Sequence, residues 1–124
     1  EDSVMSIWSM PSDVMVQTHE SFTHRFARTG VEVNGTEGSI VAQSVNTQNP
    51  TGEMTLTNAN GSRQIEFSNH NLYARSMQKF VDAVNGNGSP SATGLDGIKS
   101  LAVAMAVKEA ATSGASVDID YGGL

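Results

Sequence analysis

Two histidines, a glutamate and an arginine near the end of an early strand are the first residues that could do chemistry. They are His19, Glu20, His24 and Arg25. Imidazole and carboxylate groups can bind a metal ion or line a polar substrate cleft. Neighbouring residues of a strand point to opposite faces, so His19 and Glu20 cannot easily share one ion. No third ligand is evident, and we predict no metal site; solvated polar residues on a strand and its loop are the favoured interpretation.

Two carboxylates near the end of the chain could act as a general acid and base. Asp118 and Asp120 share one face of an alternating segment, and paired carboxylates can do this chemistry. Here they alternate with Val117, Ile119 and Tyr121, which is the pattern of a strand with one face in solvent. We therefore interpret both aspartates as the solvent side of a last strand and predict no catalytic residue in this chain.

A glycine-rich run from Gly86 to Gly94 could be read as a phosphate-binding loop. The dinucleotide fingerprint Gly-x-Gly-x-x-Gly must lie directly between a strand and a helix. Gly86 and Gly88 are followed by Ser89-Pro90 and lie between two predicted helices, so the pattern does not fit. The sequence has no Gly-x-x-x-x-Gly-Lys-Ser either. We predict that this chain by itself binds no nicotinamide or other nucleotide cofactor.

The composition narrows the classes of partner. The 124 residues include seven Lys and Arg, 13 Asp and Glu and no cysteine, with a formal net charge of −6. Scattered basic residues argue against a nucleic-acid surface, and the lack of cysteine excludes disulfides and thiolate metal sites. No stretch approaches the roughly 18 apolar residues that span a membrane, and no signal peptide is visible. We expect a cytoplasmic protein with no nucleic-acid and no membrane partner.

The elements that must position these residues begin with strands. Alternating apolar residues predict strands over 3–10 and 14–22, joined by a turn, and two short strands around Val31 and over 39–42. A clear hairpin follows, because Asn60-Gly61 separates two further alternating runs and Asn-Gly supplies the positive φ angles of a tight turn. The first half of the chain is therefore predicted to be a set of antiparallel strands.

The apolar period then changes from two to 3.6. Asn69 or Asn71 can cap a helix that runs to Val84, and Thr93 can cap a second helix that ends before Gly114. The last strand follows at Val117. This order predicts an α+β fold: a largely antiparallel, open β-sheet with two helices on one face.

Two features indicate that the other face of the sheet is free for oligomerisation. Residues 101–107 are apolar without interruption, and a helix that is apolar all round needs cover on several sides. The first hairpin carries large apolar side chains on both faces, among them Ile7, Trp8 and Met15. One face can take the helices, and the other needs a partner.

Several segments considered together point to a known family. They are the glycine-punctuated strand and turn from Gly30 to Gly38, the helical segment from Phe80 to Val84, the stretch from Pro90 to Gly97, the helix from Ser100 to Ala111, and the segment from Asp118 to Tyr121. In this order, over nearly the whole chain, they resemble the C-terminal domain of the Gfo/Idh/MocA family of NAD(P)-dependent oxidoreductases, named after glucose–fructose oxidoreductase and inositol dehydrogenase.

The resemblance implies a two-domain enzyme. An N-terminal Rossmann domain would bind NAD or NADP, a Glu-Lys-Pro motif would supply a catalytic lysine, and an Asp-x-x-x-His helix would bind the sugar or polyol. This sequence contains neither motif, so no catalytic residue is carried over. The family's cleft is bordered by the segment before Gly30, which leaves Phe22, His24, Arg25 and Arg28 as substrate-cleft candidates.

These inferences combine into one interpretation. Residues 1–124 would be a single domain, the substrate-binding and oligomerisation domain of an NAD(P)-dependent sugar or polyol oxidoreductase, present without its Rossmann domain and inactive alone. Gly30, Gly35 and Gly38 would then supply turn geometry through positive φ angles.

Two other interpretations stay open. The first is a stand-alone binding or assembly module without catalysis. The second is a small secreted β-rich binding protein, which rests on the Asn-x-Ser/Thr sequences at Asn34, Asn60 and Asn87. Asn-Gly turn chemistry is the simpler explanation of those three sequences.

Overall fold

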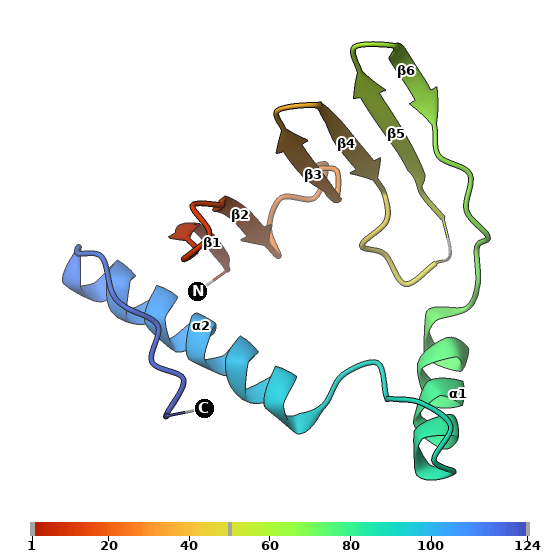
Figure 1. Cartoon of the computed structure of the whole chain (residues 1–124). Coiled ribbons are helices and arrows are strands. Elements are labelled where there is room, and N and C mark those ends of the chain that lie inside the picture. Colours follow the sequence, from red (N-terminus) through yellow and green to blue (C-terminus); the bar gives the residue numbers. More distant parts are fainter. Residues whose placement is uncertain (1, 50, 124) are drawn as a thin grey trace. The chain divides into compact units, whose positions relative to one another are not determined.

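The computed structural model of the chain describes residues 2–49 and 51–123. These residues form six strands and two helices in the order β1 to β6, α1 and α2 (Figure 1). All strand pairs are antiparallel, so the α+β class predicted from the sequence is confirmed. The chain divides into two units, Glu1–Arg25 with Pro90–Leu124 and Phe26–Ser89.

The first unit contains a two-stranded sheet and one helix. Its elements are β1 (Ser3–Ser9), β2 (Met15–Ser21) and α2 (Gly94–Ser113). The turn between the strands is closed by hydrogen bonds from the Met10 backbone N–H to the Val14 carbonyl (2.9 Å) and from the Asp13 N–H to the Met10 carbonyl (3.0 Å). Asp13 adopts a left-handed φ of 61°, which an aspartate tolerates in a tight turn.

The β1–β2 hairpin has two different faces. One face is partly buried and carries Val4, Ser6, Trp8, Val16 and Thr18. On this face the Trp8 indole N–H donates to Ser6 Oγ at 2.8 Å. The opposite face exposes three large apolar side chains: Met5 (68%), Ile7 (69%) and Met15 (73%). The hairpin therefore carries apolar side chains on both faces, as the sequence predicts.

The second unit contains a four-stranded sheet and one helix. Its elements are β3 (Gly30–Gly35), β4 (Gly38–Gln43), β5 (Glu53–Asn58), β6 (Gly61–Gln64) and α1 (Leu72–Val84). The strands lie in sequence order. The predicted strands thus form two separate sheets, because among the described residues neither β1 nor β2 pairs with any of β3 to β6.

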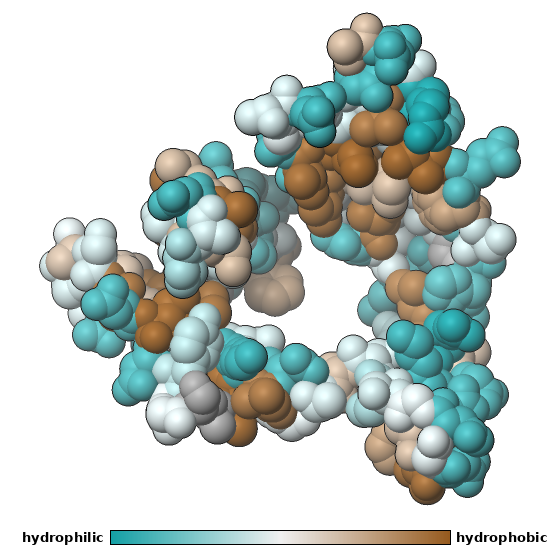
Figure 2. Space-filling model, in the orientation of Figure 1, coloured by the Kyte–Doolittle hydropathy of each residue, from teal (hydrophilic) through white to brown (hydrophobic). Residues whose placement is uncertain are grey.

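The strand register gives the four-stranded sheet an apolar face. Val33 pairs with Ile40, which pairs with Leu56 on the next strand. Val31 and Met54 pair with Ala42, which is 6% exposed and is the buried hydrophobic residue of the described chain. Figure 2 shows hydrophobic surface gathered over these strands. The alternating pattern in the sequence therefore separates an apolar face from a polar one.

Three glycines of this sheet have a different role from the one predicted. Positive φ angles do not explain Gly30, Gly35 and Gly38, because none of them adopts the left-handed conformation. At Gly30 an added Cβ atom would lie 2.5 Å from the Ala42 carbonyl oxygen, and at Gly38 it would lie 2.5 Å from that of Thr57. Close approach of a neighbouring strand, and not turn geometry, requires glycine at these two positions.

The two helices have the capping residues that the sequence predicts. The Asn71 side chain accepts a hydrogen bond from the Ala74 N–H at 2.9 Å and begins α1. Thr93 and Asp96 form a reciprocal capping box at the start of α2, and Gly114 ends this helix with a φ of 68°. Asn71, Thr93 and Gly114 are thus confirmed as helix ends. The two helices belong to different units, so their placement on one face of a sheet stays a prediction.

The predicted last strand is not formed among the described residues. Residues 116–121 have no ladder partner there. Val117 and Ile119 are half-buried, whereas Asp118 and Asp120 are exposed, so the alternation of the sequence persists without the pairing. The reason is that alternation determines which side chains share a face, while a strand also needs a neighbour for its backbone hydrogen bonds.

Candidate functional site

The candidate cleft residues follow directly after β2. Ser21, the last residue of that strand, accepts hydrogen bonds at Oγ from the backbone N–H groups of Thr23 (3.2 Å) and His24 (3.3 Å). The Arg25 N–H then donates to the Thr23 carbonyl at 2.9 Å. A serine hydroxyl that binds the next backbone N–H groups turns the chain. This turn fixes the backbone that carries His24 and Arg25.

Phe22 presents its ring to solvent. Its backbone N–H donates to the Asp2 carbonyl at 2.8 Å, so the backbone continues the β1–β2 pairing by one residue. The side chain is nevertheless 96% exposed. An exposed phenylalanine leaves a large apolar area in water, and its ring is available for an apolar surface of a ligand or a partner.

His24 lies against His19. The two ring centroids are 4.8 Å apart and the rings meet edge to face at 64°. Glu20 accepts a hydrogen bond from Thr18 Oγ1 at 3.1 Å, on the strand face opposite His19, as the sequence predicts. Within residues 2–49 and 51–123, no three His, Cys, Asp or Glu side chains form a group that could hold a metal ion.

Arg28 belongs to the second unit and lies at one end of the β3–β4 ladder. Its Nη1 donates to Gln43 Oε1 at 3.2 Å, and the adjacent Ser44 N–H donates to the Thr29 carbonyl at 2.7 Å. Gln43 pairs with Gly30 at this end. A guanidinium group has five N–H donors, so one bond to Gln43 orients Arg28 and leaves donors for hydroxyl or carboxylate groups.

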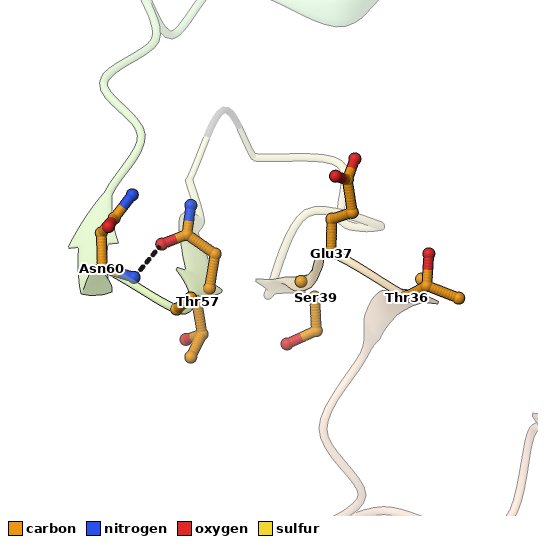
Figure 3. A pocket seen from close by; sticks show the side chains of 9 residues that line it. Thr36, Glu37, Ser39, Thr57 and Asn60 are labelled. Carbon is orange, nitrogen blue, oxygen red and sulfur yellow. Dashed lines mark hydrogen bonds between the residues drawn. The ribbon is translucent and has the colours of Figure 1, made fainter.

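A hollow lies at the other end of the same ladder. It is lined by the two hairpin turns: Gly35, Thr36, Glu37, Gly38, Ser39, Thr57, Asn58, Ala59 and Asn60. Figure 3 shows these side chains, with the Asn60 N–H donating to Asn58 Oδ1 at 2.9 Å. Sequence reasoning did not single out this hollow, because its residues are those expected in tight turns. It contains one carboxylate, Glu37, and no paired acid and base.

The glycine-rich segment after α1 does not suit a dinucleotide. The Gly86 N–H donates to the Ala83 carbonyl (3.0 Å) and the Asn87 N–H donates to the Asp82 carbonyl (2.8 Å). These N–H groups cap the C-terminal end of α1, which carries a negative partial charge and repels phosphate. The N–H groups of Gly86 and Asn87 are therefore already bonded to carbonyl groups, at a helix end that does not attract phosphate.

The start of α2 does not suit a dinucleotide either. The Asp96 carboxylate accepts hydrogen bonds from the Thr93 backbone N–H (2.8 Å) and hydroxyl (2.7 Å). The backbone bond, and then the hydroxyl bond, hold the pKa of Asp96 below its usual value. An anionic side chain thus already occupies this helix end. Neither of these two segments is a dinucleotide-binding loop of the Gly-x-Gly-x-x-Gly type, because both lie between two helices and not between a strand and a helix.

The two C-terminal carboxylates are separate and exposed. Asp120 Oδ1 accepts a hydrogen bond from the Gly122 N–H at 2.8 Å, which is a local turn interaction. Asp118 is exposed as well. This placement agrees with their interpretation as solvent-side residues. Neither helix in the described part of the chain is long and apolar enough to cross a membrane.

Comparisons with known proteins agree with the resemblance in the sequence. A family model described as the C-terminal alpha/beta domain of an oxidoreductase family matches residues 6–119, which run through both units. A 1,5-anhydro-D-fructose reductase of Ensifer adhaerens is 46% identical over 122 residues. The match covers 98% of this chain and 37% of the relative, so the chain spans little more than a third of that protein's length. The chain belongs to the Gfo/Idh/MocA oxidoreductase family and carries its C-terminal domain.

Proposed function

We propose that this chain is the substrate-binding and oligomerisation domain of an NAD(P)-dependent reductase of a sugar or polyol, and that it is inactive alone. The observation that carries the proposal is the match of 98% of the chain to 37% of a reductase. That relative is named for 1,5-anhydro-D-fructose, so a keto-sugar derivative is the substrate class. Since the glycines from Gly86 to Gly94 lie between two helices and not between a strand and a helix, we assign the nicotinamide to a Rossmann domain outside residues 1–124.

The four cleft candidates supply chemistry that suits a sugar. The exposed ring of Phe22 can pack on the C–H groups of a sugar ring. His24 and Arg25 can bind hydroxyl groups. Arg28, held at 3.2 Å from Gln43, can donate to a hydroxyl or carbonyl oxygen from a fixed position. We assign these residues to binding and orientation, and none of them to a chemical step.

The oligomerisation part of the proposal rests on the exposed face of the β1–β2 hairpin. Met5, Ile7 and Met15 are each about 70% exposed there. A second copy of the chain on this face would remove these apolar side chains from water. We expect the wild-type chain to associate, and Met15→Lys to shift it towards monomer. Gln64→Lys places the same charge on an exposed polar position and should leave association unchanged. A wild-type chain that sediments as a clean monomer at high micromolar concentration contradicts this part.

A chimaera tests the enzymatic part. In the reductase of Ensifer adhaerens, the segment that matches this chain is replaced by this chain, and reduction of 1,5-anhydro-D-fructose is followed by oxidation of NADH or NADPH. We expect the chimaera to be active and the chain alone to be inactive and to show no micromolar NADH binding. Activity of the chain alone, or tight NADH binding to it, overturns the proposal.

Matched arginine variants of the chimaera test the cleft. Arg28→Ala should raise KM roughly tenfold or more, because a hydrogen bond to a charged group contributes about 1.5–3 kcal/mol. Arg75→Ala, which removes an exposed arginine of α1, should leave KM unchanged. Equal changes of KM in the two variants would show that Arg28 does not line the cleft.

The alternative function is a stand-alone binding or assembly module without catalysis. This alternative is favoured by the sequence of residues 1–124, which contains neither the Glu-Lys-Pro motif nor the Asp-x-x-x-His motif. A folded chimaera that binds the nicotinamide and reduces no sugar would support this alternative. A cytoplasmic location, which the cysteine-free sequence favours, is also part of our proposal, and glycan on the native protein at Asn34, Asn60 or Asn87 would contradict it.

A further inference from the structure

The chain contains four Asn-Gly dipeptides, at Asn34, Asn60, Asn85 and Asn87. In such a pair the glycine backbone nitrogen can attack the asparagine Cγ, forming a succinimide ring as the side-chain nitrogen leaves as ammonia. Water then opens the ring to aspartate or isoaspartate, with no oxidant or reductant. Glycine favours the reaction because it has no Cβ to hinder the attack. We propose that Asn87 is the deamidation site of the folded chain and reacts before the other three.

Asn34 is held by its side chain. Its Nδ2 donates to Glu32 Oε1 at 3.0 Å, and both Asn34 and Gly35 lie in β3, where Gly35 pairs with Gly38. The amide that must be attacked is fixed by a carboxylate, and the backbone around the attacking nitrogen is held extended by the sheet. Ring closure therefore requires the β3–β4 hairpin to open locally.

Asn60 is held by its backbone. Its N–H donates to Asn58 Oδ1 at 2.9 Å. Gly61 begins β6 and pairs with Asn58 across the two-residue turn. Rotation about the Asn60 backbone towards a succinimide would break the pairing at the turn, so this site is protected as long as the β5–β6 hairpin is formed.

Asn85 is protected through its neighbour. The Gly86 N–H, which contains the attacking nitrogen, donates to the Ala83 carbonyl at 3.0 Å. The Asn85 N–H itself donates to the Val81 carbonyl at 3.1 Å. Attack on the Asn85 side chain therefore has to break the cap at the C-terminal end of α1 first.

Asn87 differs because neither its side-chain amide nor the attacking backbone nitrogen of Gly88 takes part in a hydrogen bond among the described residues. Its backbone is anchored by the bond from its N–H to the Asp82 carbonyl at 2.8 Å. Among the described residues, no hydrogen bond is made by the Asn87 side-chain amide or by the Gly88 N–H. Gly88 has a φ of 123°, and nothing lies within 4 Å of the position a Cβ would take. The five-membered ring can therefore form without breaking a hydrogen bond or displacing a neighbour.

The product places a new charge at an unfavourable end of a helix. Aspartate or isoaspartate at position 87 brings a carboxylate close to the C-terminal end of α1, where the partial charge is already negative. Isoaspartate also lengthens the backbone by one methylene group in the segment that joins α1 to α2. We therefore expect deamidation at Asn87 to weaken the last turn of α1, including the bond to the Asp82 carbonyl.

Peptide mapping by mass spectrometry of the whole chain tests the proposal. The folded chain is incubated at mildly alkaline pH, and each Asn-Gly peptide is followed for the mass change of amide to acid and for splitting into aspartate and isoaspartate. The same incubation in concentrated urea is the reference for the unfolded chain. We expect Asn87 to react first in the folded chain, and the four rates to converge in urea.

Two variants and the order of the rates decide the outcome. Asn87→Gln should remove the early product, while Asn85→Gln should leave the Asn87 rate unchanged. Faster reaction at Asn34, Asn60 or Asn85 in the folded chain overturns the proposal. The same order of rates in urea also overturns it, because the selectivity would then come from sequence and not from structure.

Discussion

Gly38→Ala is the substitution that most directly tests the packing of the four-stranded sheet. A Cβ at this position would lie 2.5 Å from the Thr57 carbonyl oxygen and 3.1 Å from the Asn58 Cβ. Carbon–oxygen contacts between strands are ordinarily about 3.3–3.6 Å, so β4 and β5 would have to separate by roughly 1 Å here. Forcing an extra carbon into a packed position costs about 1–3 kcal/mol.

Gly35→Ala is the matched control on the partner residue of the same hairpin. Gly35 pairs with Gly38, and its added Cβ would lie 3.6 Å from the Gly38 carbonyl oxygen, which is an ordinary contact. Its φ is outside the left-handed region. An alanine that fits the native backbone stabilises by about 0.4–1 kcal/mol, because it restricts the unfolded chain. The two variants should therefore differ by roughly 1.5–4 kcal/mol in their free energy of unfolding.

Urea unfolding followed by circular dichroism measures this difference. Gly38→Ala should unfold at a lower urea concentration than the wild type, by about 1 M, with an unchanged slope m. Gly35→Ala should unfold at the same concentration or a higher one. Equal destabilisation by both substitutions would refute close approach and restore a turn-conformation explanation. A stable Gly38→Ala variant would show that β4 and β5 are not held together at this point.

Three further predictions concern the helix ends. Thr93→Ala should reduce the free energy of unfolding by about 1 kcal/mol, because it removes the oxygen that accepts the Asp96 N–H at 3.2 Å; Ser91→Ala is the control in urea unfolding. Asn71→Ala should cost a similar amount, about 1 kcal/mol, whereas Asn69→Ala should be neutral because Asn71 is the cap. The pKa of Asp96 is lowered in the folded chain, so its stabilisation is complete above its usual pKa of 3.8 and is lost as the pH falls below that value. Asp96→Asn should remove this part of the acid dependence of the helical circular dichroism signal, and an unchanged acid profile would contradict the prediction.

The features that the sequence predicted well are those decided by neighbouring residues. A cap needs a side chain of the right type within three residues of the first turn, so Asn71 and Thr93 could be identified from the sequence. The same holds for Gly114, because the end of a helix requires a residue that tolerates a left-handed φ. The two faces of the β1–β2 hairpin follow from a period of two.

The features that the sequence missed depend on distant residues. Gly30 and Gly38 are required by the carbonyl groups of Ala42 and Thr57, which lie on adjacent strands, and no local pattern shows which strand will approach. The segment 116–121 alternates like a strand and has no ladder partner among the described residues. Pairing is a property of two segments, and a periodic pattern in one of them describes only half of it.

The candidate site also depends on residues that are distant in the sequence, so local patterns did not identify it. The exposed ring of Phe22 and the bond between Arg28 and Gln43 come from the structure, but the choice of these residues came from the family resemblance. A sugar site is made by a few polar groups and one apolar surface that converge from separate segments, and such residues have no fixed spacing in sequence.

The hydrogen bonds at its helix ends explain why the glycines between α1 and α2 of this domain do not form a dinucleotide-binding loop. After α1, the N–H groups of Gly86 and Asn87 are bonded to the carbonyl groups of Ala83 and Asp82. At the start of α2 the Asp96 carboxylate lies where a phosphate would have to lie. These bonds stabilise the two helices, and a pyrophosphate could replace them only by breaking them. Helix capping within the domain and cofactor binding by the same backbone groups therefore exclude each other, and the glycines between the helices are there for the turn.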